Sequence, residues 1–386
     1  MLIQTDSQLS AFCDAAKRQA TLFLDTEFVG EGRYYPELGT IQAGIDGQAV
    51  VIDPITVRDL TPFFALLTDP GIEKVFHAST QDLAIFYRLL GCPVAPVFDT
   101  QIAAALLGYD EQISFLNLVE RATGTHLSKS HGFTDWLRRP LTPGQIEYAL
   151  DDVRYLIPVY EYVVRELKKR ERLLWSREEF RPLEDPARYR QGNPDELYLR
   201  VRGVERLRGK TLGALRELVA YREETARQQN LPIGRIARDE VLVELARHPR
   251  TAVKELEEVR GLAPQQIARF GVGLISAAQR GSANPPPKVN RQPSLSNGLE
   301  PTVDFLMLCL RSLAGELEIS PGLIATRADL AELIIDGHQA DIPLMRGWRR
   351  KIIGEALLAT LQGKATARIL PDSRRVHLDW HADVRW

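Results

Sequence analysis

The sequence of 386 residues is poor in cysteine and contains no long apolar run. Its three cysteines, Cys13, Cys92 and Cys309, lie far apart, so they form neither a paired disulfide framework nor the close spacing of a zinc site. No stretch reaches the ~20 apolar residues that a membrane-spanning helix needs. The first residues lack the basic segment and apolar run of a secretory signal. We therefore expect a protein of the reducing cytoplasm that does not bind membranes.

The remaining composition is that of a globular protein with two or three domains, with 44% apolar and 26% charged residues. A net charge of -2 hides an uneven distribution. Residues 1–165 carry 21 acidic and 12 basic residues, whereas residues 205–281 carry 10 acidic and 14 basic residues. This asymmetry fits a metal-dependent site joined to a polyanion-binding surface, although so small an excess also arises by chance.

Strand and helix patterns alternate along the first part of the chain. Strands are expected at 21–28, 39–45, 49–53, 74–78 and 97–99, and helices at 7–20, 62–67, 80–90 and 100–107. Asp46-Gly47 favours a hairpin, so the first three strands are predicted to form an antiparallel meander. A meander followed by strand–helix alternation predicts an α/β domain with a mixed sheet and helices on its faces.

Two acidic residues stand near the end of the first predicted strand. Because side chains alternate along a strand, Asp25 and Glu27 project from the same face. Two carboxylates ~4 Å apart repel by ~4 kcal/mol at an effective dielectric constant near 20, so a divalent cation with oxygen ligands is a natural partner. The alternative is a strand that surfaces with both acids in solvent.

Two further stretches carry acids in defined positions. Asp82 falls in the first turn of the helix after His77-Ala-Ser-Thr-Gln, where Ser79 as the N-cap offers a purely structural explanation. Tyr148 and Asp152 are four residues apart on a helix that starts at Thr142-Pro143, so they share a face. A surface pair on an amphipathic helix is the alternative for these two residues.

Together the three stretches resemble the DEDD superfamily of 3′→5′ exonucleases, in the branch that carries the tyrosine. Phe98-Asp-Thr-Gln101 and Phe133-Thr-Asp-Trp-Leu-Arg-Arg-Pro-Leu141 are similar to the ribonuclease D family in particular. The resemblance covers about residues 1–180 and implies a ribonuclease H-like fold, in agreement with the predicted mixed sheet.

The resemblance also implies the chemistry. Asp25, Glu27, Asp82 and Asp152 would hold two divalent ions, Mg²⁺ or Mn²⁺, with Asp25 bridging both. Tyr148 would orient the attacking water, because an unperturbed pKa near 10 disfavours a general base at neutral pH. The implied reaction releases 5′-phosphomononucleotides from RNA 3′ ends, most plausibly from transfer RNA precursors. The 3′→5′ direction rests on the resemblance alone.

Neighbouring polar residues have simpler explanations. His77 is expected to pack or to form hydrogen bonds, and Asp99 is expected to cap the helix from residue 100. Lys129, Arg138 and Arg139 are candidates for phosphate contacts, and equally for solvated charges.

The second half of the chain predicts two helical modules joined by linkers. The expected boundaries are 1–180 for the exonuclease domain, 181–204 for a connector, 205–281 for a first helical domain, 282–299 for a Pro-rich linker, 300–366 for a second helical domain and 367–386 for a tail. The modules repeat each other at an offset of 88: Gly234, Ile236, Ala237, Leu242, Glu244 and Leu245 match Gly322, Ile324, Ala325, Leu330, Glu332 and Leu333. We therefore expect a duplicated domain.

The first copy resembles the helicase-and-ribonuclease-D C-terminal (HRDC) domain, which binds nucleic acid. Arg235, Arg238, Lys254 and Arg260 are candidate phosphate contacts, with a solvated charged surface as the alternative. The whole chain is expected to act as a monomer on structured RNA. Two alternatives remain open: a DNA exonuclease of the same fold, and an RNA-binding scaffold without catalysis, against which the presence of all four carboxylates argues.

Overall fold

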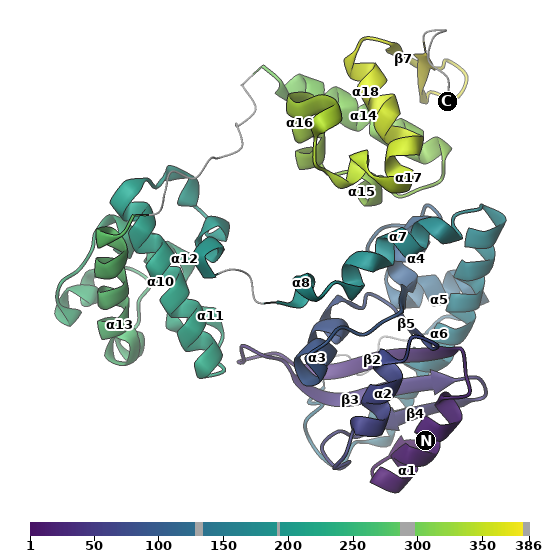
Figure 1. The fold of residues 1–386 in the computed structure, drawn as a ribbon, viewed down its shortest axis with the longest axis horizontal. Coiled ribbons are helices and arrows are strands. Elements are labelled where there is room, and N and C mark those ends of the chain that lie inside the picture. The colour runs from purple at the N-terminus through teal and green to yellow at the C-terminus, as the bar shows by residue number, and fades with distance from the viewer. Residues whose placement is uncertain (128–133, 191–193, 286–297, 381–386) are drawn as a thin grey trace. The chain divides into compact units, whose positions relative to one another are not determined.

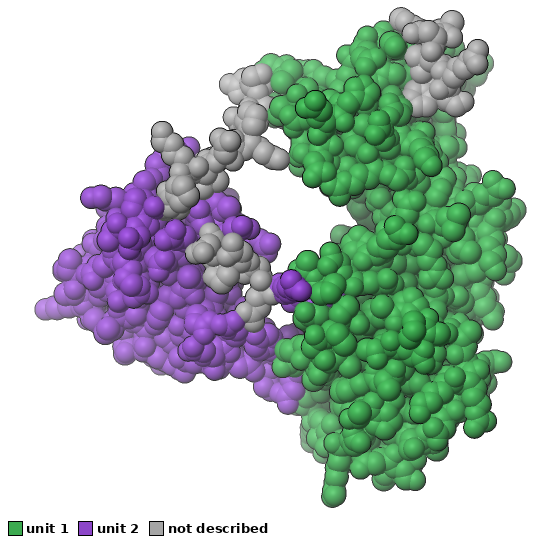
Figure 2. Space-filling view, in the orientation of Figure 1, with its two compact units in different colours: residues 1–27, 38–188, 293–386 green, residues 28–37, 189–292 purple. Residues whose placement is uncertain are grey.

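The computed structural model describes residues 1–127, 134–190, 194–285 and 298–380 (Figure 1). The chain divides into two compact units. One comprises residues 1–27, 38–188 and 293–386, and the other comprises residues 28–37 and 189–292 (Figure 2). A short segment from the first part of the chain therefore folds with helices that follow much later in the sequence.

A six-stranded mixed sheet forms the centre of the first unit, in the order β1-β4-β3-β2-β5-β6. The strands are β1 (Leu2–Ile3), β2 (Thr21–Val29), β3 (Glu37–Ile45), β4 (Gln48–Ile52), β5 (Glu73–Phe76) and β6 (Val97–Asp99). β3 and β4 pair antiparallel across the predicted hairpin, whereas β5 pairs parallel with both β2 and β6. The predicted mixed sheet is confirmed. β1, which adds to β4 in parallel, was not predicted, because two residues carry no periodic pattern.

Helices cover this sheet. They are α1 (Asp6–Ala16), α2 (Thr61–Thr68), α3 (Thr80–Leu90), α4 (Thr100–Ala105), α5 (Phe115–Thr123), α6 (Pro143–Lys169) and α7 (Leu173–Glu184), followed by α8 (Pro186–Tyr189), which has no buried residue. α6 begins at the predicted Thr142-Pro143 start with a capping box, in which Thr142 accepts from the Gln145 backbone and the Gln145 side chain accepts from the Thr142 backbone. α7 continues to Glu184, inside the segment expected to be a connector.

Aromatic side chains fill the space between the sheet and its helices. Phe98 on β6 is fully buried, and its ring centroid lies 4.9 Å from that of Tyr160 on α6 and 4.8 Å from that of Phe180 on α7. Burying a side chain of this size stabilises a fold by about 1.5–3 kcal/mol. The long helix that carries Tyr148 and Asp152 is thereby fixed against the sheet that carries Asp25 and Glu27.

The second unit is a helical bundle with its own apolar core. Its elements are α9 (Pro194–Leu197), η1 (Tyr198–Arg200), η2 (Val204–Arg206), α10 (Gly209–Gln228), α11 (Ile233–Ile236), α12 (Asp239–Arg247), η3 (Val253–Glu258) and α13 (Pro264–Ala283). α10 and α13 approach closely at Gly213 and Gly281, where an added Cβ on either glycine would overlap the other helix.

The segment 28–37 is attached to this bundle by three hydrogen bonds. The backbone N–H groups of Tyr34 and Tyr35 donate to Asn230 Oδ1 at 3.1 and 2.9 Å. The Tyr34 hydroxyl donates to Glu223 Oε2 at 3.1 Å, and its ring packs on the helical core. The loop between β2 and β3 is thus a structural part of the second unit.

The C-terminal helical region belongs to the first unit. Its elements are α14 (Glu300–Glu316), α15 (Pro321–Ile324), α16 (Arg327–Asp336), η4 (Gly337–Gln339), η5 (Pro343–Met345), α17 (Gly347–Arg349), η6 (Arg350–Gly354), α18 (Glu355–Leu361) and a hairpin of β7 (Ala365–Ile369) and β8 (Val376–Trp380). The hairpin, which begins two residues before the predicted tail, was not expected. Among the described residues, no helix combines the length and apolarity required to cross a bilayer.

Candidate active site

Three of the predicted carboxylates meet at one point. Asp25 and Glu27 on β2 and Asp152 on α6 each place an oxygen within 4.8 Å of the others. The strand alternation predicted from the sequence brings the first two together, and the packing of α6 supplies the third. Asp152 Oδ2 is buried and has no hydrogen-bond partner among the residues that the structure describes. A buried carboxylate oxygen without a hydrogen-bond donor lowers the stability of the fold. This oxygen therefore requires a cation or a proton.

Asp82, the fourth predicted carboxylate, is 6% exposed and accepts a short hydrogen bond from the Thr26 hydroxyl. Thr26 lies between Asp25 and Glu27 in the sequence, so the strand that supplies two acids also positions a third. Nothing local in the sequence indicates this role of Thr26, because its partner lies 56 residues away.

Burial and mutual repulsion raise the pKa values of the cluster. Desolvation, followed by the charges of Asp152 and Asp82, holds the pKa of Asp25 well above its usual value. Desolvation and the neighbouring aspartates raise the pKa of Glu27 to about 9. Burial raises the pKa of Asp82 to about 6, and the Thr26 hydrogen bond limits that rise. Such a cluster favours a proton or a cation over a set of bare charges.

Tyr148 lies one helical turn before Asp152 on α6. Its ring centroid is 6.1 Å from that of the buried Trp136. Burial, followed by the charges of Asp152 and Glu27, raises the pKa of Tyr148 above its ordinary value. The phenol therefore keeps its proton at neutral pH and is a hydrogen-bond donor at the edge of the carboxylate cluster.

The turn from β5 to α3, which places Asp82, is held by Asp99. The carboxylate of Asp99 accepts from the backbone N–H groups of Ala78 and Ser79 at 3.2 and 2.8 Å, and from the Ser79 hydroxyl at 2.7 Å. Ala78 has a φ of 59°, which is unusual for a residue other than glycine. Ser79 is the N-cap of α3, as the structural alternative proposed, but its hydroxyl accepts no capping bond and donates to Asp99.

Asp99 also caps α4, since its Oδ1 accepts from the backbone of Gln101 and Ile102 at 2.9 and 3.3 Å. The predicted capping role is confirmed. His77 lies just after β5, with Nδ1 3.0 Å from Thr100 Oγ1 and Nε2 3.0 Å from the Ile113 carbonyl oxygen. The expectation of a hydrogen-bonding role for His77 is likewise confirmed.

Arg139 has a structural role in the fold. Its guanidinium donates two hydrogen bonds of 2.8 Å to the fully buried Asp53 carboxylate and one of 2.7 Å to the Gly39 carbonyl oxygen. Arg139 therefore has a structural role in place of the two expected alternatives, a phosphate contact or a solvated charge, because its charge compensates a buried acid. Lys129 lies outside the described residues.

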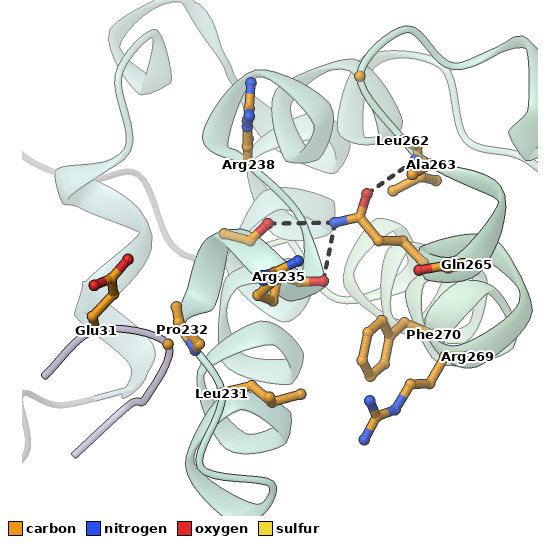
Figure 3. A pocket seen from close by; sticks show the side chains of 14 residues that line it. Glu31, Leu231, Pro232, Arg235, Arg238, Leu262, Ala263, Gln265, Arg269 and Phe270 are labelled. Carbon is orange, nitrogen blue, oxygen red and sulfur yellow. Dashed lines mark hydrogen bonds between the residues drawn. The ribbon is translucent and has the colours of Figure 1, made fainter. Parts of the chain in front are cut away.

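The basic residues predicted in the first helical domain are all exposed. Arg235 and Arg238 line one pocket with Arg269, which the sequence analysis did not name (Figure 3). Lys254 on η3 and Arg260 before α13 do not line that pocket.

The oxygen donors at the cluster fit the hard divalent cations that the fold family implies. Carboxylates from Asp25, Glu27 and Asp152 converge, one buried oxygen lacks a donor, and no soft ligand is among the three. The residues present therefore suit Mg²⁺ or Mn²⁺ better than a thiolate- or imidazole-bound metal.

Comparisons with known proteins match both parts of the chain. The family model described as 3'-5' exonuclease matches residues 1–168, and the HRDC domain model matches residues 211–277. A ribonuclease D of Zymomonas mobilis is 38% identical over 370 residues, which cover 94% of each chain. A ribonuclease D of Gluconacetobacter diazotrophicus is 36% identical over 369 residues, covering 94% of this chain and 93% of the relative.

A solved structure is similar over nearly the whole length. Escherichia coli RNase D, described as an exoribonuclease involved in structured RNA processing, superimposes with a TM-score of 0.83 at 31% sequence identity. The match covers 94% of this chain and 98% of that structure. The agreement extends from the mixed sheet through both helical regions.

Proposed function

The chain belongs to the ribonuclease D family of 3′–5′ exoribonucleases, and on this premise we propose that it trims the 3′ ends of structured RNAs, such as transfer RNA precursors, with two divalent metal ions. The observation that carries the proposal is the convergence of the Asp25, Glu27 and Asp152 oxygens within 4.8 Å. Partly buried acids at this separation are stabilised when cations balance their charge.

Each carboxylate has a proposed part in holding the metal ions. Asp25 would bridge both ions, Glu27 and Asp152 would bind one of them, and Asp82 would contribute to the second. When bound, the two ions stabilise the charge that develops on the attacking and leaving oxygens of the phosphodiester. Asp82 differs from the others because Thr26 already occupies one of its oxygens.

Tyr148 has the proposed role of orienting the attacking water. The raised pKa of its phenol supports donation of a hydrogen bond rather than removal of a proton. Its position one turn from Asp152 places the hydroxyl and a metal ligand on the same helix face.

We further propose that the first helical domain contacts phosphates of the RNA. Arg235, Arg238, Lys254 and Arg260 are exposed on that domain, and contacts of this kind position an RNA chain without reading its sequence.

A cleavage assay tests the proposed reaction. A transfer RNA with a 3′ extension and a 5′ label is incubated with the protein in Mg²⁺, in Mn²⁺ or in EDTA, beside a DNA of matched sequence. We expect the RNA to shorten one nucleotide at a time, only with metal. Intact RNA under both metals would refute the activity, and faster shortening of the DNA would reassign the substrate.

Substitution of Asp25 tests the metal site. We expect Asp25→Ala to lower the cleavage rate at least about 100-fold with the fold retained, because even residues that only orient metal ligands are worth about 10- to 100-fold. The rate is measured at saturating Mg²⁺, and folding is checked by circular dichroism. Wild-type activity in this variant would refute the assignment of Asp25 to the metal site.

A further inference from the structure

Trp136 lies beside the tyrosine of the carboxylate cluster. Its ring centroid is 6.1 Å from that of Tyr148, and the two ring planes are inclined by 39°. Ring centroids at this separation are typical of interacting aromatic pairs. Trp136 stands in a turn before α6, so neither a helix nor a strand fixes its backbone, and other contacts must hold it in place.

The guanidinium of Arg139 holds one side of this turn. It donates to the Trp136 carbonyl oxygen at 2.8 Å and to the Gly39 carbonyl oxygen at 2.7 Å. Two further hydrogen bonds of 2.8 Å bind it to the carboxylate of Asp53, the residue that follows β4. One cation therefore ties the turn to two neighbouring strands of the sheet.

The first turn of α6 holds the other side. The side-chain amide of the buried Gln145 donates to Thr134 Oγ1 at 3.2 Å and to the Asp135 carbonyl oxygen at 3.4 Å. The side-chain oxygen of Gln145 meanwhile accepts in the capping box of α6. The turn that carries Trp136 is therefore bound to the same helix that carries Tyr148.

Gly39 on β3 makes room for the tryptophan. A Cβ at this position would lie 2.7 Å from the Trp136 Cβ, 2.8 Å from the Trp136 carbonyl oxygen and 3.1 Å from the Glu27 carbonyl oxygen. Real Cβ atoms do not approach other atoms this closely, so any other residue here would displace the tryptophan. Trp136 is thus placed closely against the strands that carry the site, with its ring beside Tyr148.

Stability alone does not explain a tryptophan at this position. The side chain is 2% exposed, and its indole N–H has no hydrogen-bond acceptor among the residues that the structure describes. A buried donor without an acceptor destabilises a fold, and phenylalanine would fill most of the same space without such a donor. Residues that break a rule of this kind are expected at functional sites.

The role proposed for Tyr148 requires a fixed hydroxyl. The backbone of α6 fixes its Cα, but a helical residue of this type can adopt two χ1 rotamers. Exchange between the rotamers moves the hydroxyl by far more than the ~1 Å of misplacement that already lowers a reaction rate by about 100-fold. A neighbouring side chain that excludes one rotamer therefore has a direct effect on the rate.

We infer that Trp136 is a positioning residue for RNA cleavage, whose ring holds Tyr148 in the rotamer that directs its hydroxyl to the attacking water. The inference rests on the proposed function, in which Tyr148 orients that water. Trp136 itself is assigned no contact with RNA or with metal. Arg139 and Gly39 act one step further away, because they hold the backbone of the tryptophan in place.

A double-mutant cycle tests the inference. Cleavage of the 3′-extended transfer RNA at saturating Mg²⁺ is compared for the wild type, Trp136→Leu, Tyr148→Phe and the double variant, with folding checked by thermal unfolding. We expect Trp136→Leu to lower kcat about 10- to 100-fold, with KM changed by less than about threefold. In the Tyr148→Phe background the same substitution should lower kcat by less than about twofold, because no hydroxyl is left to be positioned.

Three further measurements separate positioning from a general loss of structure. Mn²⁺ affinity, measured by calorimetry, should be the same in Trp136→Leu as in the wild type, because the carboxylates are untouched. Trp136→Phe keeps a ring beside Tyr148, so kcat should return to within about fivefold of the wild type. Phe12→Leu, at a buried aromatic residue of α1, is the control and should leave kcat unchanged in both backgrounds.

Gly39→Ala tests the same point by a second route, since it displaces Trp136 without removing its ring. We expect kcat to fall in this variant as well, and again only where the Tyr148 hydroxyl is present. This variant decides the question if Trp136→Leu does not fold.

The outcomes distinguish the positioning role from the enzyme itself. Equal losses of kcat with and without the Tyr148 hydroxyl, or no loss in Trp136→Leu, would overturn the inference and leave the exoribonuclease in place. Weakened Mn²⁺ binding in Trp136→Leu would also overturn it, because the substitution would then act on the carboxylates. No metal-dependent cleavage by the wild type, or a wild-type rate in Tyr148→Phe, would overturn the proposed function on which the inference rests.

Discussion

Thr26 orients a carboxylate that belongs to another element of the fold. It lies between two acids that point into the site, and its hydroxyl donates to a third acid, Asp82. Because this hydroxyl donates to Asp82 Oδ1, it helps to fix the orientation of the carboxylate. Thr26 is a positioning residue, comparable to the partners that orient metal ligands in other sites.

Removal of that hydroxyl tests its role. We expect Thr26→Val, which keeps the shape of the side chain, to weaken Mn²⁺ binding about 10- to 100-fold, because Asp82 is then free to rotate. Binding is measured by calorimetry or by Mn²⁺ electron spin resonance. Thr40→Val provides a control at a buried threonine of β3. Wild-type affinity in Thr26→Val would show that packing alone orients Asp82.

The raised pKa values of the cluster predict how stability depends on pH. A carboxyl whose pKa is higher in the folded state binds a proton more readily there, so its stabilising contribution is present at low pH and is lost as the pH rises. For Glu27 this window runs from 4.5 to about 9. We expect the free energy of unfolding in EDTA to fall by on the order of 1 kcal/mol per pH unit in the middle of this window.

Thermal unfolding across this range measures the effect. Glu27→Gln carries no titrating group at this position and should flatten the profile, and Mg²⁺ should restore more stability at high pH than at low pH. A metal-free protein whose stability rises through the window would contradict the proposed origin of these pKa shifts.

At the scale of elements, the turn between β5 and α3 depends on one side chain. Asp99 accepts five hydrogen bonds from two segments, and it is 1% exposed. It therefore couples the end of β6 to the turn that presents Asp82.

Asp99→Ala is expected to lower the free energy of unfolding by about 3–5 kcal/mol, because several buried donors lose their acceptor at about 1–3 kcal/mol each. Urea unfolding measures the loss. Asp110→Ala, whose exposed carboxylate accepts from Gln112, should change stability by less than about 1 kcal/mol. A loss in Asp99→Ala as small as in this control would mean that water replaces the carboxylate.

Sequence patterns predicted the elements with regular periodicity and clear ends. α3 begins and ends at the predicted residues, and α6 starts at the predicted Thr142-Pro143. β1 was missed because it is too short for a pattern. The positions of Asp25, Glu27 and Asp152 followed from local geometry and resemblance. The roles of Thr26 and Arg139 did not, since their partners lie 56 and 86 positions away.

At the scale of the whole molecule, the C-terminal region is fixed to the exonuclease domain through a buried ion pair. The Arg349 and Glu179 side chains are 15% and 9% exposed, and Trp348 shares the same carboxylate. A pair that is both buried and hydrogen-bonded is destabilised strongly when one partner is removed.

Glu179→Ala is expected to weaken this attachment by about 3–5 kcal/mol, because it leaves the Arg349 charge buried. Hydrogen exchange should then accelerate in α17 and η6 while the sheet stays protected. Asp341→Ala, which removes an exposed pair with Arg346, should change exchange little. Unchanged exchange in Glu179→Ala would show that the tryptophan stack suffices for attachment.

The hydrogen bond from the Tyr34 N–H to Asn230 Oδ1 also limits when this loop can reach its final contacts during synthesis on the ribosome. The two residues are 196 positions apart. At about 5–20 residues per second, a translating ribosome would release the loop 28–37 about 10–40 seconds before α10 and Asn230 exist to receive it. During that interval the strands on either side of the loop have emerged, but Asn230 has not. The loop therefore gains this hydrogen bond only after 196 further residues have been made.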